Sequence, residues 1–266
     1  MTTALITGGT AGIGRAFADK FAALGYDLVL VARNQERLDA AAEELRGGAR
    51  GDDASAGKSG GSVRVETLSA DLATAEGRAL VEQRLSENDR PVDILVNNAG
   101  FGLGHSFRDG TLDDEERMID VHIRAVLRLT HAALPGMVLR GKGSVINVAS
   151  VAAFVPRGTY SASKAWVVSF SESVAAELGG TGVRCMALCP GFVHTEFHER
   201  AEVDPAQIPD WMWLDAPDVV DAAIDDLRKG LRVSVPSAKY KVLVGASRIV
   251  PRRLSTRVSR GVSKRW

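Results

Sequence analysis

The stretch Ala4-Leu5-Ile6-Thr7-Gly8-Gly9-Thr10-Ala11-Gly12-Ile13-Gly14 decides the fold of this chain. Its first three residues form a short apolar run typical of a buried strand, and the glycines after them indicate a tight turn. Apolar residues then recur at helical spacing as far as Gly25. A strand, a glycine turn and a helix N-terminus together place backbone N–H groups where a pyrophosphate can bind. Because the spacing of Gly8, Gly12 and Gly14 differs from G-x-G-x-x-G, a plain loop of glycines is the alternative.

Apolar runs and helical patterns alternate along the rest of the chain. Runs typical of strands occupy residues 28–31, 63–68, 94–96, 144–149 and 184–188, and helical patterns occupy 35–46, 73–88, 113–140 and the segment from Tyr160 onward. Such alternation predicts βαβ units. We therefore expect an α/β fold, a Rossmann-like doubly wound three-layer sandwich with a parallel sheet of about seven strands. Pro135 predicts a break or kink in its helix, and the polar stretch 47–62 predicts a flexible surface loop.

Composition and charge describe an ordinary globular protein with an uneven distribution of charge. The chain has 266 residues, of which 45% are hydrophobic and 25% charged, and its formal net charge is zero. Residues 227–266 nevertheless hold 12 Lys and Arg and no acid, which leaves 21 basic and 33 acidic residues in the remainder. We therefore expect an acidic body followed by a basic end.

The cysteines and the N-terminus indicate a reducing compartment. Cys185 and Cys189 lie four residues apart on a predicted strand, too far apart to bond to each other. The N-terminus lacks the basic-then-apolar pattern of a signal peptide, and no apolar run approaches the ~18 residues of a membrane span. We expect a cytoplasmic protein with two buried thiols.

The end of the second strand indicates which dinucleotide would bind. An acid at this point would hold the adenine ribose 2′-OH, whereas Arg suits a 2′-phosphate. The residues here are Ala32-Arg33-Asn34, without an acid, and Arg15 could add a second positive charge. We therefore predict NADP(H) rather than NAD(H), with a solvated residue at a helix start as the alternative for Arg33.

Tyr160 and Lys164 lie one helical turn apart and would share a face. A phenol ionises near pH ~10, and a nearby ammonium would lower that pKa, which makes the pair a possible general acid/base. The alternative is a surface Tyr beside a solvated Lys. Ser150 follows the fifth strand, at the edge where open α/β sheets bind ligands.

Four ordered elements resemble the short-chain dehydrogenase/reductase family across residues 1–236. They are Thr7-Gly8-x3-Gly12-Ile13-Gly14, Asn97-Asn98-Ala99-Gly100, Ser150 with Tyr160-x3-Lys164, and Pro190-Gly191 with Thr195. The resemblance implies that Ser150 orients a substrate carbonyl, that Tyr160 transfers a proton, and that Lys164 binds the nicotinamide ribose and lowers the pKa of Tyr160. It implies adenine contact by Asp71 and carboxamide contact by Thr195. Its cofactor contacts would be Gly8, Thr10, Gly12, Ile13, Gly14, Arg33, Asp71, Leu72, Asn98, Ala99, Gly100, Tyr160, Lys164, Pro190, Gly191, Val193 and Thr195.

The chain departs from the family pattern at two places. His122 stands where the family has an Asn that supports a proton-relay water at a helix bulge, so His122 would either bind a water, as a fourth catalytic residue, or pack as a plain histidine. Ser150 and Tyr160 are only ten residues apart, which predicts a tight loop over 151–159.

The segment after Pro190 and the C-terminal end bear on ligands and partners. Apolar side chains that would line a substrate pocket are Phe154, Phe192, Phe197, Trp211, Met212 and Trp213; the alternative is that the tryptophans pack a lid. His194 and His198 lack a third ligand, so we expect no metal. Residues 237–266 form a predicted basic tail, where apolar residues at every fourth position from 250 to 266 could contact an anionic membrane or a partner, or pack on the body.

Together these patterns predict an NADP(H)-dependent oxidoreductase that interconverts an apolar ketone and a secondary alcohol. We expect a small-molecule substrate, no nucleic acid, and a homodimer or homotetramer. The alternatives are a non-catalytic NADP-binding redox sensor or scaffold, and a membrane-associated lipid or 3-oxoacyl reductase.

Overall fold

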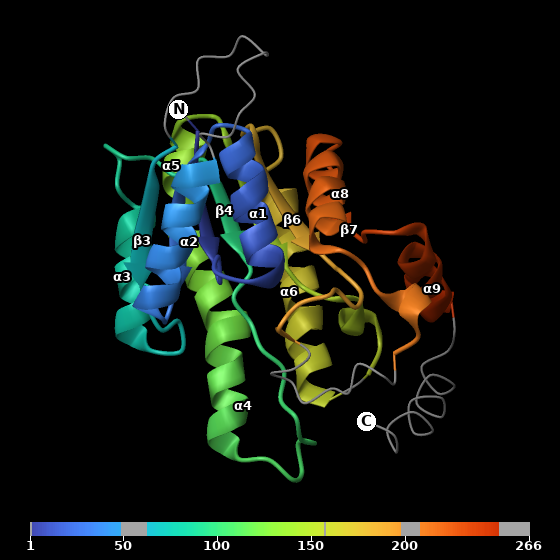
Figure 1. Ribbon diagram of the computed structural model, residues 1–266. Coiled ribbons are helices and arrows are strands. Elements are labelled where there is room, and N and C mark those ends of the chain that lie inside the picture. The colour runs from blue at the N-terminus through green and yellow to red at the C-terminus, as the bar shows by residue number, and fades with distance from the viewer. Residues whose placement is uncertain (1, 49–62, 157, 198–207, 250–266) are drawn as a thin grey trace.

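The centre of the molecule is a parallel sheet (Figure 1), seen in a computed structural model that describes residues 2–48, 63–156, 158–197 and 208–249. Within these residues the sheet has seven strands in the order β3-β2-β1-β4-β5-β6-β7, and every neighbouring pair is parallel. The strands are β1 (Thr3–Thr7), β2 (Asp27–Ala32), β3 (Val65–Ser69), β4 (Ile94–Asn97), β5 (Gly143–Val148), β6 (Val183–Leu188) and β7 (Val233–Ser234). The order reverses between β1 and β4, and this reversal creates a crevice at the carboxyl ends of the strands.

Helices cover both faces of the sheet, as the predicted three-layer sandwich requires (Figure 1). One face carries α1 (Gly12–Ala23), α2 (Gln35–Gly48) and α8 (Ala216–Arg228), and the other carries α3 (Ala75–Leu85), α5 (Val126–Leu139) and α6 (Gly158–Glu177). Alternate strand residues feed the two cores: Ile6 and Leu30 pack on the first face, whereas Leu5 and Val29 pack on the second. This burial on both faces explains the continuous apolar runs in the sequence, and the predicted fold is confirmed.

The interruption expected near Pro135 lies elsewhere. The helical region passes from α4 (Leu112–Ile119) through a π-helical turn, η1 (Asp120–Ala125), into α5, which continues through Pro135 to Leu139. Pro135 has no backbone N–H, so the carbonyl of His131 lacks its helical hydrogen-bond donor. Both residues are exposed, so water can replace the missing bond. The break therefore falls at His122, inside η1.

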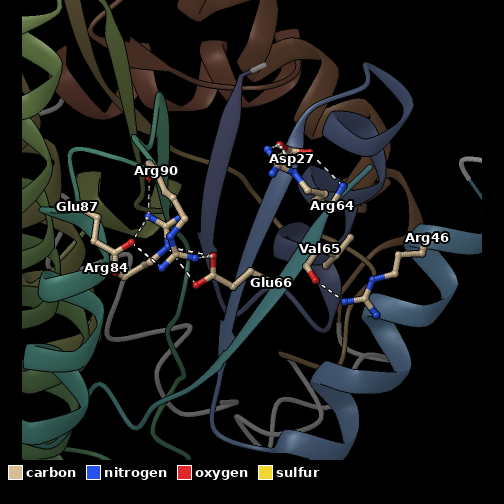
Figure 2. Close-up of polar contacts among 8 residues, drawn as sticks. All are labelled: Asp27, Arg46, Arg64, Val65, Glu66, Arg84, Glu87 and Arg90. Carbon is tan, nitrogen blue, oxygen red and sulfur yellow. Dashed lines mark hydrogen bonds and ion pairs between the residues drawn. The ribbon is translucent and has the colours of Figure 1, made fainter. Parts of the chain in front are cut away.

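Charged side chains hold β3, the edge strand of the sheet (Figure 2). Glu66 on β3 accepts hydrogen bonds from Arg84 (Nε to each oxygen, 3.1 Å) and from Arg90 (Nη1 to Oε2, 3.1 Å). Just before β3, Arg64 pairs with Asp27 on β2, with 2.6 Å between Nη2 and Oδ2. An edge strand crowded with charges is protected against pairing with another chain.

The C-terminal part divides into a packed helix and a segment outside the described residues. Helix α9 (Ala238–Ile249) packs on the body, with Tyr240 only 2% exposed, so the structured part of the chain extends past residue 236. The predicted loop over 47–62, apart from its first two residues, and the predicted amphipathic segment 250–266 lie outside the described residues, as does His198, and the expectations about them stay predictions. Among the described helices none is long and apolar enough to cross a membrane.

Candidate active site

The glycine turn after β1 is tight and leaves the start of α1 open. Gly8 and Gly12 have positive φ angles of 66° and 55°, and a Cβ on Gly14 would lie 2.2 Å from the carbonyl oxygen of Gly8. Helix α1 begins without a side-chain cap, because the residue before it is Ala11. Its first N–H groups are therefore available to an anion.

The turn after β4 is fastened to the glycine turn. The hydroxyl of Thr7 accepts hydrogen bonds from the backbone N–H groups of Asn98 (2.9 Å) and Ala99 (3.0 Å). The side-chain amide of Asn98 donates to the carbonyls of Thr7 (3.0 Å) and Gly8 (3.2 Å). The predicted cofactor residues on either side of the switch between β1 and β4 therefore lie together.

The segment after β6 closes on the same turn. A Cβ on Gly12 would lie 2.9 Å from Cγ2 of Thr195, which places this threonine directly against the glycine turn. The next residue, Glu196, binds Arg37 on α2 through both carboxylate oxygens, at 2.8 Å and 3.1 Å from Nη2. Residues from the two halves of the chain thus meet beside the glycine turn.

Arg33 lies exposed just after β2, with its carbonyl accepting a hydrogen bond from the hydroxyl of Ser69 (3.1 Å). Arg15, the possible second positive charge, is bound by Asp19 (2.9 Å) and Glu44 (2.7 Å). Arg37 is bound by Glu196. Among the described contacts, Arg33 has no partner for its guanidinium, so it is the arginine there best able to receive an added phosphate.

The Asp71-Leu72 turn after β3 is braced by two arginines. Asp71 accepts hydrogen bonds from the backbone N–H of Ala73 (3.0 Å) and from Arg117 (2.9 Å). The carbonyl of the buried Leu72 accepts a hydrogen bond from Arg78 (2.9 Å). The predicted adenine residues therefore belong to a fixed turn, and the Asp71 carboxylate already has partners.

Helix α6 brings Tyr160 and Lys164 together beside Ser150. The Lys164 ammonium lies 5.8 Å from the centroid of the Tyr160 ring and donates to the carbonyl of Val148 (2.9 Å), at the end of β5. Ser150 follows that strand, and its hydroxyl accepts from the N–H of Ala152 (3.1 Å) at the start of η2 (Val151–Phe154). The short loop expected after Ser150 is thus a single 3₁₀ turn next to the phenol.

Burial is the main cause of the pKa shifts of Tyr160 and Lys164. Tyr160 is half-buried, and burial raises the pKa of Tyr160 to about 12, against the opposing effect of a hydrogen bond with Ser150. Burial also lowers the pKa of Lys164 to about 8. Loss of water therefore dominates the pKa of Tyr160, and the expectation that Lys164 lowers this pKa stays a prediction. A phenol with a raised pKa keeps its proton at neutral pH and can donate it.

His122 is completely buried and has a protein partner at each ring nitrogen. Its Nε2 accepts the backbone N–H of Phe101 (3.1 Å), and its Nδ1 lies 2.9 Å from the hydroxyl of Ser163. The ring also contacts the rings of Phe101 and Tyr160, each with 5.6 Å between centroids. Sequence reasoning did not identify Ser163, because only the folded chain brings η1 against α6.

The expected apolar pocket residues divide into two groups. Phe197 lies 5.9 Å from the ring of Tyr160, whereas Trp213 packs on Phe192 (5.9 Å) and stacks on His194 (4.5 Å between centroids). Trp211 is 61% exposed. Across the part of the chain that the structure describes, no cluster of three or more His, Cys, Asp or Glu could hold a metal.

Two residues of α9 hold the segment that carries the expected pocket residues, and no sequence pattern pointed to either of them. The hydroxyl of Tyr240 donates to the carbonyl of Met212 (2.7 Å) and accepts the N–H of Phe192 (3.1 Å). Lys239 donates to the carbonyl of Trp213 (3.0 Å). A Cβ on Gly191 would lie 2.0 Å from the Tyr240 ring, so only glycine fits there.

Known proteins resemble this chain over most of its length. The family model for short chain dehydrogenase matches residues 2–205. Sulfoacetaldehyde reductase 2 of Chromohalobacter salexigens is 39% identical over 198 residues, and the NADP-dependent 3-hydroxy acid dehydrogenase YdfG of Salmonella typhi is 36% identical over 201 residues, each match covering 73% of both chains.

Solved structures extend the likeness to the fold. A short-chain dehydrogenase from Sphingobium yanoikuyae in complex with NADPH is 36% identical with a TM-score of 0.81, and the match covers 93% of this chain and 94% of that one. A bulky-bulky ketone specific alcohol dehydrogenase from Comamonas testosteroni is 30% identical with a TM-score of 0.77, covering 93% and 92%.

Proposed function

The chain belongs to the short-chain dehydrogenase/reductase family, and from that premise we propose that it transfers hydride between NADP(H) and a ketone or secondary alcohol. The observation that carries the proposal is the meeting of Ser150, Tyr160 and the buried Lys164, whose ammonium lies 3.5 Å from the position of a Cβ on Gly100 in the turn after β4. A buried lysine beside a phenol and a hydroxyl is the kind of perturbed group that gathers at active sites, which supports chemistry over binding alone.

The residues around the crevice fit a dinucleotide. Gly12 and Gly14 let the turn pack closely against Thr195 and the Gly8 carbonyl, and α1 offers uncapped N–H groups that could bind a pyrophosphate. Arg33 would receive the 2′-phosphate, which supports NADP(H), as do the NADPH complex of the Sphingobium yanoikuyae enzyme and the NADP dependence of YdfG. When bound, NADPH supplies the hydride.

The chain's own groups would supply the proton and the orientation. In the reducing direction the neutral Tyr160 hydroxyl donates a proton to the substrate oxygen, while the Ser150 hydroxyl holds that oxygen. Lys164, anchored to the Val148 carbonyl, presents its remaining N–H groups toward a nicotinamide ribose. In the oxidising direction the same phenol must first lose its proton.

We infer an apolar substrate from the side chains near Tyr160. Phe197 lies against the phenol ring, and Phe192 and Trp213 pack together on the segment after β6. The relatives include a reductase named for sulfoacetaldehyde and a dehydrogenase named for bulky ketones. The aromatic side chain of Phe197 beside Tyr160 favours the second kind of substrate.

A panel of carbonyl compounds with NADPH, followed by absorbance of the cofactor, tests the proposal. We predict that Tyr160→Phe retains NADPH binding but lowers kcat by roughly 10²–10⁴, the usual contribution of a general acid, which is about 3–5 kcal/mol on the barrier. A Phe variant within a few-fold of wild type would contradict the assigned role. NADPH binding without turnover of any carbonyl would favour the sensor or scaffold instead.

A further inference from the structure

The strongest unexplained feature is the burial of His122 between helix α6 and the turn after β4 (residues 98–101), which we call the cofactor turn. His122 comes from η1, Phe101 directly follows Asn98-Ala99-Gly100, and Ser163 comes from the second turn of α6. Ser163 in turn donates to the backbone carbonyl of Tyr160 (2.8 Å). A continuous series of hydrogen bonds therefore runs from the cofactor turn to the residue that carries the phenol.

The positions of the hydrogens follow from counting donors. The backbone N–H of Phe101 is a donor, so Nε2 must accept. The single proton of the Ser163 hydroxyl goes to the Tyr160 carbonyl, so Nδ1 must carry a proton and donate to Ser163. The ring is thus neutral, with its proton on Nδ1. Burial, and then the charge of Lys164, lower the pKa of His122 well below its usual value, in agreement with a neutral ring.

We infer that His122 is a positioning residue that ties the cofactor turn to the N-terminal part of α6 through two direct hydrogen bonds, one from each ring nitrogen. Both nitrogens are used by protein groups, so the side chain has no site left for a relay water. The inference rests on the proposed function, since it concerns the placement of Tyr160 and of the cofactor turn in that reaction.

The two bonds should have separable effects. The Nδ1 bond ends on the Ser163 hydroxyl, which in turn donates to the backbone carbonyl of Tyr160, so its loss should displace the phenol and lower kcat. The Nε2 bond ends on Phe101, next to Gly100, so its loss should weaken NADPH binding. A Cβ on Gly100 would lie 3.1 Å from Nε2, which shows how closely the turn and the imidazole approach.

Three variants separate the bonds. Ser163→Ala removes the Nδ1 bond together with the bond from Ser163 to the Tyr160 carbonyl. His122→Gln is designed to remove the Nδ1 bond alone, while its amide oxygen can still accept from Phe101. We expect both to lower kcat by about 10- to 100-fold, the effect of a slightly misplaced reacting group, with the Kd for NADPH within about twofold. His122→Leu removes both bonds and should in addition weaken NADPH by about fivefold, the value of one neutral hydrogen bond.

Ser161→Ala is the matched control. Ser161 lies in the same turn of α6 and is equally buried, but its hydroxyl has no hydrogen-bond partner among the described residues. Its kcat should stay near that of wild type, and adding Ser163→Ala to His122→Gln should cause little further loss. If Ser163→Ala has the same kcat as Ser161→Ala, the hydrogen bonds through His122 and Ser163 do not position Tyr160. The same conclusion follows if the fold-loss in kcat of the double variant equals the product of the losses of the two single variants.

A measurement without turnover separates this inference from the proposed reaction. Nitrogen NMR of the labelled imidazole in the full-length protein should report a neutral ring protonated on Nδ1, whether or not any carbonyl is reduced. A ring protonated on Nε2, or one unchanged by Ser163→Ala, would overturn the inference. If no carbonyl compound is reduced but the NMR spectrum shows the neutral ring protonated on Nδ1, only the proposed reaction is overturned.

Discussion

Burial of Lys164 costs the folded protein stability, and the cost depends on pH. Its pKa falls from 10.5 to about 8 on folding, a difference of about 3 kcal/mol. The unfolded chain binds this proton more readily, so the penalty is complete below about pH 8 and disappears as the pH rises to 10.5. The lysine is therefore retained despite its effect on stability, as active-site groups often are.

We predict that Lys164→Met abolishes turnover but stabilises the protein at neutral pH. Met has a similar volume and no charge to desolvate, so removal of the penalty should outweigh the lost bond to Val148, worth about 1 kcal/mol. Urea unfolding at pH 7 and at pH 10.5 measures this effect. The advantage of the variant should be about 2 kcal/mol at pH 7 and should vanish or reverse at pH 10.5; a variant less stable than wild type at pH 7 would show that Lys164 is not penalised.

Arg33 provides a second prediction at the scale of one residue. Arg33→Ala should weaken NADPH by about ten- to hundredfold, the value of a charge-assisted hydrogen bond, and leave NADH nearly unchanged. Fluorescence titration with both cofactors decides the matter, because NADH serves as the internal control. Equal losses for the two cofactors would mean that Arg33 does not bind the 2′-phosphate.

Among the elements, α9 controls the segment that lines the pocket. Tyr240 joins Phe192, just after β6, to Met212 in η4 (Asp210–Met212), and Lys239 caps the same short helix. The pocket wall therefore depends on a helix that is remote from it in sequence.

We predict that Tyr240→Phe raises KM for the carbonyl substrate more than it changes the Kd for NADPH. The phenyl ring still fills the space against Gly191, but two hydrogen bonds are lost and the N–H of Phe192 is left without its partner, which should lower the free energy of unfolding by about 1–3 kcal/mol. Tyr26→Phe is the control, because the Tyr26 hydroxyl makes no hydrogen bond within the described part of the chain. An unchanged KM in Tyr240→Phe would make α9 a purely structural element.

The elements show where sequence reasoning succeeds and where it stops. Strands such as β4 were predictable because a strand buried on both faces must be apolar throughout, and the glycine turn because its backbone tolerates no other residue. The π-helical turn η1 was indicated only by the family resemblance, which implies a helix bulge at His122. The rule for Pro135 put the break in the wrong place, since it considers only local bonds and not whether water can replace them. The pairing of His122 with Ser163 joins residues 41 positions apart, and no local pattern records such a contact.

For the molecule as a whole, the sequence predicts which residues form the candidate site better than it predicts their pKa values or the extent of the basic tail. The candidate residues Ser150, Tyr160 and Lys164 were identifiable from their spacing and their place after a strand. Their pKa values were not, because these depend on how much water the folded chain excludes from each group. The apparent tail was only partly separable by composition, since the basic residues Lys239 and Lys241 belong to α9, which packs on the body.

The strand order has a consequence for how the chain assembles as it is made. Each strand pairs with one that precedes it in the chain: β2 joins β1, β3 joins β2, β4 takes the other side of β1, and β5, β6 and β7 follow in turn. On the ribosome, every strand would therefore emerge when its partner has already been synthesised, and none would have to insert between two paired strands. Until β4 appears, however, β1 presents an open, apolar edge. A nascent chain should be most prone to aggregate during the interval between β3 and β4.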